Sequence, residues 1–335
     1  MIWVDDIIVA GGKQQTAQVL KLLESRYKMV FLGPVSWYLG IKIVRGTNKE
    51  GLKYLAMSQE AYADKVTKKF LPEGTKPQAV PMLKGSEPLP EVEDASEASE
   101  LEEWRKKVPY REAIGSLMYL MMCTRPDIAT AVVKLSKFAA APTKAHWRGV
   151  QRVLQYLKHT MKFGLVYIRN KSDVQASVYV DASYGDSDTL RRSTTGIASY
   201  VHGNLVGWAS QTQKCVSKST AEAEYVALSE AVAGAIWLRR LMLELTGVLP
   251  DKILVFEDNM GALFLAKNQA DHRRSKHIDV RYHFTRFYVQ EGVVDIQKLD
   301  TRDMIADVFT KALPRVRFEE LRAKLGVMDV HEMQG

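Results

Sequence analysis

The sequence contains little cysteine and no long apolar run. Cys123 and Cys215 are its only cysteines and lie far apart, so we expect neither a disulfide framework nor a zinc site. No segment approaches the roughly 18 consecutive apolar residues that span a membrane. The acids Asp5 and Asp6 stand where a signal peptide requires positive charge. These absences predict a soluble, intracellular protein that is not secreted and does not enter a membrane.

Positive charge exceeds negative charge in this chain. There are 47 Lys and Arg against 39 Asp and Glu, a formal net charge of +8, which favours polyanionic partners. A basic housekeeping enzyme is the alternative that composition leaves open. A prior of about 150 residues per domain predicts about two domains for this length.

The N-terminal part of the chain mixes short apolar runs with helical stretches. We predict a helix near Gln14 to Tyr27, a strand at Trp37 to Val44 and a helix at Ala61 to Phe70. Residues 71–107 are rich in proline and acids, which predicts a solvated linker, with an acidic binding tail as the alternative.

The rest of the chain predicts a mixed sheet with helices packed on it. Apolar stripes at three- and four-residue spacing predict helices over residues 109–160, and the elements that follow have the order β-β-β-α-β-α-α-β-α. The predicted strands are Gln175 to Asp181, Thr194 to Val201, Leu205 to Gln211, Ile253 to Phe256 and Val293 to Leu299. The predicted helices are Ala221 to Leu245, one from about Met260, Ile278 to Gln290 and Met304 to Ala312.

Two aspartates come at the ends of apolar strands. Asp181 follows Ser177 to Val180, where a buried charge is costly unless it is paired or bound to metal. The alternative is an Asp that starts a turn. Asp258 follows the strand that begins at Ile253, and its alternative role is a helix N-cap.

Three more acids lie on predicted helices. Ser219 and Glu222 fit a capping box, which gives Glu222 a structural role. Glu224 has no such role and lies at the edge of the buried stripe, facing the sheet. Asp307 has apolar neighbours, and the polar side of an amphipathic helix is its alternative placement.

Four of these acids predict a two-metal site for phosphodiester hydrolysis. Mg²⁺ prefers oxygen ligands, and carboxylates distant in sequence but convergent in space are what such hydrolysis requires. The leading hypothesis is therefore a nuclease whose catalytic acids are Asp181, Glu224, Asp258 and Asp307.

These acids and their surroundings resemble the ribonuclease H domain of copia-type retrotransposon Pol polyproteins. The matching blocks are Tyr179 to Ser183, Ser193 to Gly196, Ser217 to Leu228, Glu257 to Asn259, Lys276 to Asp279 and Ala306 to Lys311. Upstream, the resemblance extends to the end of the reverse transcriptase and to the connecting region. Those blocks are Val4 to Ile7, Trp37 to Ile41, Gly115 to Tyr119 and Thr124 to Ile128.

The resemblance implies an α/β fold. It consists of a ribonuclease-H-like mixed five-stranded sheet with flanking helices, preceded by a truncated α+β reverse transcriptase palm/thumb remnant and a helical connection. The implied segments are 1–80 (truncated reverse transcriptase remnant), 81–108 (acidic, proline-containing linker), 109–170 (helical connection), 171–315 (ribonuclease H domain) and 316–335 (C-terminal tail).

The implied reaction is Mg²⁺-dependent hydrolysis of the RNA strand of an RNA–DNA hybrid. The four acids would hold two Mg²⁺ ions, which Mn²⁺ can replace; one would activate the attacking water and the other would stabilise the leaving 3′ oxygen. Contacts to the 2′-hydroxyl would distinguish RNA from DNA. The partners would be the hybrid and the remainder of the Pol polyprotein, in cytoplasmic virus-like particles or in the nucleus. Residues placed to contact phosphates, with solvated surface charge as the alternative, are Arg191, Arg192, Lys214 and Lys218.

Two departures from the related families bear on activity. Asp5 and Asp6 resemble the paired aspartates of the polymerase motif, with Trp3 where Tyr is usual. The fingers and the upstream catalytic Asp are missing, so we expect no DNA synthesis. The loop Asp300 to Asp303 lacks the histidine that many ribonucleases H carry. The alternative function is an inactive relic that binds nucleic acid without cleaving it; reverse transcriptase is a third, disfavoured hypothesis.

Overall fold

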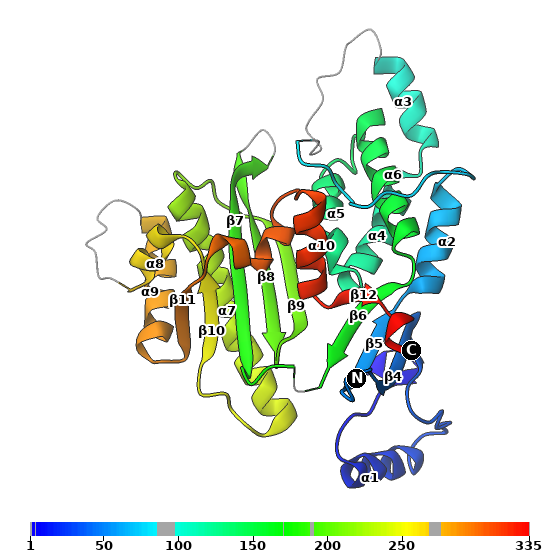
Figure 1. Ribbon diagram of the computed structural model, residues 1–335, viewed down its shortest axis with the longest axis vertical. Helices are drawn as coiled ribbons and strands as arrows, with labels where there is room; N and C mark the ends of the chain where they lie inside the picture. The colour runs from blue at the N-terminus through cyan, green and yellow to red at the C-terminus, as the bar shows by residue number, and fades with distance from the viewer. Residues whose placement is uncertain are drawn as a thin grey trace.

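The computed structural model describes residues 2–3, 5–85, 98–169, 171–187, 191–267 and 276–334. Within these ranges the chain forms two five-stranded sheets with helices around them (Figure 1). The mixed α/β fold class predicted from the sequence is confirmed. None of the helices in the described ranges is long and apolar enough to cross a membrane.

The first sheet has the strand order β11-β10-β7-β8-β9. Strands β7, β8 and β9 are antiparallel neighbours, whereas β10 runs parallel to both β7 and β11. The strands are β7 (Ala176–Ser187), β8 (Arg192–Val201), β9 (Asn204–Thr212), β10 (Ile253–Glu257) and β11 (Val294–Lys298). This order along the chain is the predicted one.

Helix α7 covers one face of this sheet. Alternate β7 residues, among them Val178 and Val180, pack against apolar α7 residues such as Ala227 and Leu228 in one buried cluster. A strand presents every second side chain to the same face, so the intervening residues Tyr179 and Asp181 face the opposite side. The helices that follow β9 and β10 are α7 (Thr220–Thr246), α8 (Met260–Lys267) and α9 (Lys276–Gln290).

The opposite face of the sheet is covered by a 3₁₀ segment and by the helices of the connecting region. Their apolar side chains form a second buried cluster with Ala198 and Tyr200 of β8. Trp208 of β9 also donates its indole N–H to the carbonyl of Met121, 3.0 Å away. The helices are α2 (Glu60–Phe70), α3 (Ala98–Lys107), α4 (Tyr110–Cys123), η1 (Pro126–Ile128), α5 (Ala129–Ser136), α6 (Lys144–His159), η2 (Thr301–Asp303), η3 (Ile305–Phe309) and α10 (Arg315–Lys324).

The second sheet joins distant parts of the chain. Its order is β12-β6-β5-β4-β3, and every pair is antiparallel. The segments predicted as polymerase remnant, connection and C-terminal tail each contribute at least one strand. The strands are β3 (Trp37–Tyr38), β4 (Ile41–Thr47), β5 (Lys53–Ser58), β6 (Phe163–Ile168) and β12 (Val327–Asp329), with η4 (Glu332–Gln334) after them.

Three predicted elements differ from the observed ones. The strand predicted at Trp37 to Val44 is interrupted at Leu39 and Gly40, which both have positive φ and form a tight turn. The helix predicted at Met304 to Ala312 is the short 3₁₀ segment η3, preceded by an extended Met304. Part of the predicted linker is helix α3, while residues 86–97 of that linker lie outside the described residues.

The N-terminal elements are small. Strands β1 (Ile2–Trp3) and β2 (Asp6–Ile7) pair as a short hairpin, and α1 (Lys13–Glu24) has no buried residue. In Figure 1, α1 projects away from both sheets.

Candidate metal centre

Asp181 lies on β7, and strand pairing places Asp258 next to it. β10 and β7 are paired in parallel with Phe256 opposite Tyr179. Continuing that register by two residues brings Asp258 beside Asp181, because parallel strands advance together. Asp181 is only 3% exposed although it is an aspartate. The turn position that was its alternative is therefore wrong: the chain continues along β7 to Ser187.

Glu224 reaches the same point from the first turns of α7. Ser219 is the N-cap of that helix, and its hydroxyl accepts a hydrogen bond from the Glu222 N–H at 3.2 Å. The Glu222 carboxylate accepts from the N–H of Lys218, one residue before the predicted position. Glu222 thus has the structural role expected for it, while Glu224 is buried against the end of β7 and accepts from the backbone of Ala182.

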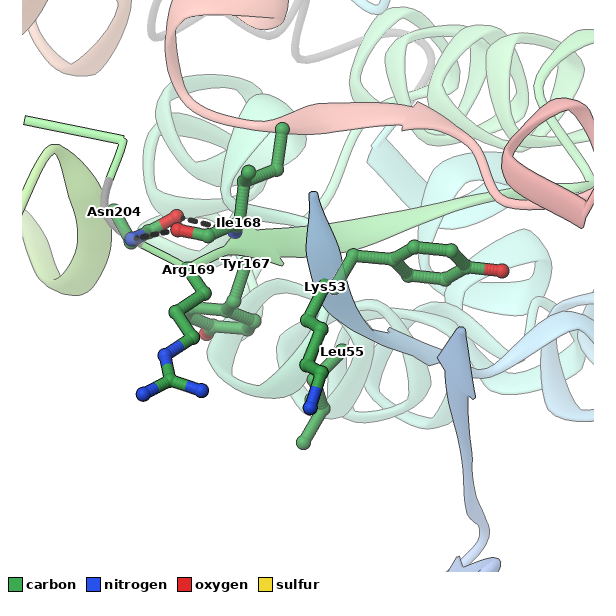
Figure 2. Close-up of a pocket in the computed structure, with 7 residues that line it drawn as sticks. Lys53, Leu55, Tyr167, Ile168, Arg169 and Asn204 are labelled. Atoms are coloured by element: carbon green, nitrogen blue, oxygen red, sulfur yellow. Dashed lines mark hydrogen bonds between the residues drawn. The ribbon is translucent and has the colours of Figure 1, made fainter. Parts of the chain in front are cut away.

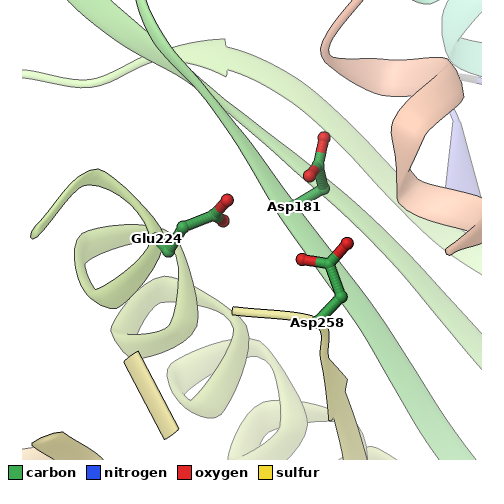
Figure 3. Close-up of side chains that lie close together, drawn as sticks. All are labelled: Asp181, Glu224 and Asp258. Carbon is green, nitrogen blue, oxygen red and sulfur yellow. The ribbon is translucent and has the colours of Figure 1, made fainter. Parts of the chain in front are cut away.

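Asp181, Glu224 and Asp258 converge on one small space. One carboxylate oxygen of each lies within 4.8 Å of the others. Figure 3 shows the three side chains pointing toward one another from β7, from α7 and from the end of β10. No other group of three possible metal ligands lies so close together in the ranges that the structure describes. The N-cap of α8 is Asn259, whose side chain accepts from Gly261 and Ala262, so the alternative role of Asp258 as that cap is wrong.

Asp307 approaches the cluster from η3, on the other side of Asp181. It is buried, so its alternative placement on the polar side of an amphipathic helix is wrong. Gly196 permits the approach, because a Cβ there would lie 2.6 Å from the Thr310 side chain and 2.8 Å from the carbonyl of Ala306. Gly196 is paired with Asp181 in the sheet, so this contact holds η3 directly over the site.

Two residues that follow Asp307 also contact the cluster. The Thr310 hydroxyl donates a short hydrogen bond to Asp181 Oδ2. The Lys311 ammonium lies 2.6 Å from Asp307 Oδ1 and 3.6 Å from Asp181 Oδ2. The structure thus connects Asp307 to the other acids through a cation of the protein itself.

Glu257 is a further buried acid at this site that the sequence analysis did not select. It is fully buried, and it faces α7 because it alternates with Asp258 along β10. One of its oxygens accepts from the N–H of Asn259 at 2.9 Å. Among the described residues, neither Glu257 Oε2 nor Glu224 Oε2 has a hydrogen-bond partner. The sequence feature that could have identified Glu257 is its position at the end of an alternating apolar strand.

Burial and mutual repulsion disfavour the ionised form of several of these carboxylates. Burial, followed by the nearby charges of Glu257 and Asp181, raises the pKa of Glu224 to about 10. Burial raises the pKa of Glu257 well above its usual range. Burial also raises the pKa of Asp307 to about 6, and that of Asp181 against the opposing effect of Lys311. A cation bound among these groups would remove that repulsion.

The donor set fits a hard divalent cation. All the converging atoms are carboxylate oxygens, which Mg²⁺ and Mn²⁺ prefer. The buried, unpartnered Glu224 Oε2 in the described structure is a polar atom that a metal ligand role would satisfy. Asp181, Glu224 and Asp258 are therefore the residues that would hold the ion.

Without divalent ions, the free energy of unfolding is expected to fall as the pH rises. The folded protein holds the Glu224 proton up to a pH of about 10, whereas the unfolded chain releases it near 4.5. The stabilising effect of that proton is complete below the unfolded pKa and disappears as the pH passes through the folded one. Asp307 also lowers the free energy of unfolding as the pH rises from 3.8 to about 6.

Added Mg²⁺ is expected to counter this loss, and more strongly at higher pH, because metal binding requires ionised carboxylates. Melting temperatures measured across neutral pH with Mg²⁺ or with chelator would test both effects. A Glu224→Gln variant serves as the control, since its profile in chelator should be flatter. A wild-type profile in chelator that is no steeper than that of the variant would contradict the expectation.

The four basic residues predicted to contact phosphates lie at the same end of the sheet as the cluster. Arg192 begins β8 and Arg191 directly precedes it. The N–H of Gln213 donates to the carbonyl of Ser193, which brings the end of β9 beside them. Lys214 and Lys218 are exposed in the loop that follows. Their phosphate contacts stay a prediction.

Gln213 is the residue that orders this loop. Its buried amide nitrogen donates to Thr195 Oγ1 at 3.1 Å and to the carbonyl of Ala223 at 2.8 Å. Its amide oxygen accepts from the Ser217 hydroxyl at 3.2 Å. The loop that carries Lys214 is thereby fixed to both β8 and the start of α7. Because the three contacts come from separate segments, sequence periodicity gave no indication of this role.

The two aspartates that resemble a polymerase motif and the described surface hollow lie apart from this site. Asp5 and Asp6 are exposed in the β1–β2 hairpin and are not part of the three-acid group. The hollow lies along β5 and β6, and Figure 2 shows the Lys53 and Arg169 side chains extending from it. None of the predicted site acids lines it.

Comparison with known proteins identifies similar sequences across nearly the whole chain. Residues 1–84 match the family model described as reverse transcriptase (RNA-dependent DNA polymerase). The Retrovirus-related Pol polyprotein from transposon TNT 1-94 of Nicotiana tabacum is 38% identical over 333 residues, covering 98% of this chain and 24% of that protein. A putative transposon Ty5-1 protein of Saccharomyces cerevisiae is 30% identical over 238 residues, covering 69% of this chain and 71% of that one.

The chain spans about a quarter of the length of the tobacco polyprotein. Among solved structures, the N-terminal ribonuclease H domain of a Mycobacterium tuberculosis protein is similar over 45% of this chain and 98% of that one. The identity is 10% and the TM-score is 0.32.

Proposed function

Because the chain belongs to the family of copia-type retrotransposon Pol polyproteins, we propose that it hydrolyses the RNA strand of RNA–DNA hybrids with Mg²⁺. The observation that carries the proposal is the convergence of Asp181, Glu224 and Asp258 within 4.8 Å. This is a set of oxygen ligands held by three different elements of a rigid sheet-and-helix frame. Bound divalent ions supply charge neutralisation at the phosphate and an activated water.

The remaining site residues orient the acids and the substrate. Thr310 donates to Asp181 and so fixes the direction of that carboxylate. The backbone of Ala182 does the same for Glu224. Exposed basic residues at this end of the sheet are suited to hold the phosphates of the hybrid, and 2′-hydroxyl contacts would select RNA. The hybrid, and the rest of the polyprotein, are the proposed partners.

A matched pair of variants on α7 tests the proposal. The full chain is incubated with an end-labelled RNA–DNA hybrid, in Mg²⁺ or in chelator. We expect cleavage of the RNA strand alone, only in Mg²⁺. Glu224→Gln should abolish cleavage, because it removes a ligand. Glu222→Gln should retain cleavage. It should lower the free energy of unfolding by roughly 1 kcal/mol or less, since the substitution only weakens a helix cap.

Loss of cleavage at Glu222 with none at Glu224 would overturn the choice of ligands. Binding of the hybrid without cleavage under every condition would instead favour the inactive nucleic-acid-binding protein.

A further inference from the structure

Lys311 lies where a second cation of the site would be expected. Its ammonium is 2.6 Å from Asp307 Oδ1 and 3.6 Å from Asp181 Oδ2, so it bridges the two acids. Arg317 adds a second positive charge, 3.8 Å from Asp307 Oδ2. The Asp181–Asp307 half of the site is thus neutralised by side chains of the protein.

In the other half of the site, no described cationic side chain bridges the carboxylates. In the described structure, Glu224 Oε2 and Glu257 Oε2 are buried without a hydrogen-bond partner, and no ion pair is formed by Glu224 or Asp258. The two halves share Asp181 but differ in charge. A divalent ion entering among Asp181, Glu224 and Asp258 meets three carboxylates with no ammonium between them, because the nearby Lys298 ammonium donates to the backbone carbonyl of Asp258. One entering between Asp181 and Asp307 meets the Lys311 ammonium that bridges them.

The Lys311 side chain is able to move away from the two carboxylates. Its side chain is 41% exposed, while the carboxylates it bridges are only 4% and 7% exposed. A lysine is a compact charge on a flexible stem, so rotation into solvent requires no movement of η3. The two carboxylates beside it favour the charged form of the ammonium.

We propose that Lys311 is a resident cation that takes the place of the second divalent ion, so that the chain without nucleic acid binds a single ion, at Asp181, Glu224 and Asp258. This inference rests on the metal site of the proposed function. A second ion binds between Asp181 and Asp307 only after Lys311 has moved away. Residue 311 then sets how many divalent ions the free protein holds.

Mn²⁺ binding to the full chain, without nucleic acid, tests the proposal. Paramagnetic resonance counts free and bound Mn²⁺ and gives a stoichiometry and an affinity for each site. We expect one strong site in the wild type and a second in Lys311→Met, its affinity raised about tenfold or more, because a unit charge a few ångströms away repels a divalent ion even with water-like screening. Lys311→Arg keeps the charge and should resemble the wild type.

Lys324→Met is the matched control. Lys324 is 36% exposed and also pairs with two carboxylates, those of Asp303 and Glu320, at 3.5 and 3.2 Å. Its removal should leave Mn²⁺ binding unchanged. Circular dichroism on each variant confirms that the fold is retained.

The outcomes separate this inference from the proposed function. If Asp258→Asn abolishes the strong site but Lys311→Met binds Mn²⁺ as the wild type does, the role of Lys311 is refuted and the metal centre stands. Two equal sites in the wild type refute it as well. If Asp258→Asn binds Mn²⁺ like the wild type, the metal centre of the proposed function is itself refuted.

Discussion

Asp181→Asn is expected to abolish cleavage of the RNA strand while leaving the fold intact. Asp181 is shared by both halves of the site, contacting Thr310 and Lys311 and lying within reach of Glu224 and Asp258. Loss of one ligand removes a few kcal/mol of charge stabilisation, which corresponds to about a hundredfold or more in rate. Single-turnover cleavage of a labelled hybrid measures the loss.

The same substitution is not expected to lower the melting temperature in chelator. Burial raises the pKa of the Asp181 carboxyl, so replacing it with a neutral amide of the same shape removes an unfavourable charge. Asp303→Asn, at an exposed aspartate, is the control for both measurements. A variant that cleaves at the wild-type rate would exclude Asp181 from the site, and one that unfolds would show that the carboxylate is structural.

Arg125→Met is expected to cost about 3–5 kcal/mol of unfolding free energy, the typical loss on removing one partner of a buried ion pair. The Arg125 guanidinium donates twice to Asp127, at 3.0 and 2.8 Å, and also to Thr160. Tyr156 donates a further bond to Asp127 at 2.5 Å. Both charged side chains are at most 2% exposed. Urea unfolding followed by circular dichroism gives the change.

The chain contains a matched control for this pair. Arg302 donates to Asp300 through the same two nitrogens, each at 3.0 Å, but there the side chains are 89% and 49% exposed. Exposed pairs are screened by water and contribute little. Arg302→Met is therefore expected to leave the urea midpoint unchanged. Similar effects at the two positions would mean that burial does not decide the energy of the Arg125 pair.

Local patterns predicted the elements that carry the site. The β-β-β-α-β-α-α-β-α order follows from apolar alternation and helical stripes, and all of those elements except the last helix are present. The 3₁₀ segment η3 stands in place of that helix. The position of Glu222 in the helix cap followed from Ser219 three residues earlier. These features depend on residues that are close in sequence.

Apart from the convergence of the acids, features that depend on distant contacts were not predicted. Strand β6 is identified by its pairing with β5, more than a hundred residues earlier. Glu257 is buried beside Glu224 because of the face that β10 presents to α7. The 3₁₀ form of η3 accompanies its close contact with Gly196, where two backbones meet. The role of Lys311 was not predicted, because it depends on contacts with Asp181 and Asp307 that form only in the folded structure. Lys276 to Asp279, a block of the resemblance, has side chains outside the described residues.

The second sheet also has a consequence for synthesis on the ribosome. β5 has one edge paired with β4, and its other edge is paired only by β6, which is translated much later. At about 5–20 residues per second, that edge waits on the order of ten seconds for its partner. An open strand edge can pair with another chain during that time. Nascent molecules are therefore most prone to aggregate before residue 168 emerges, and slower elongation should lower the yield of native protein.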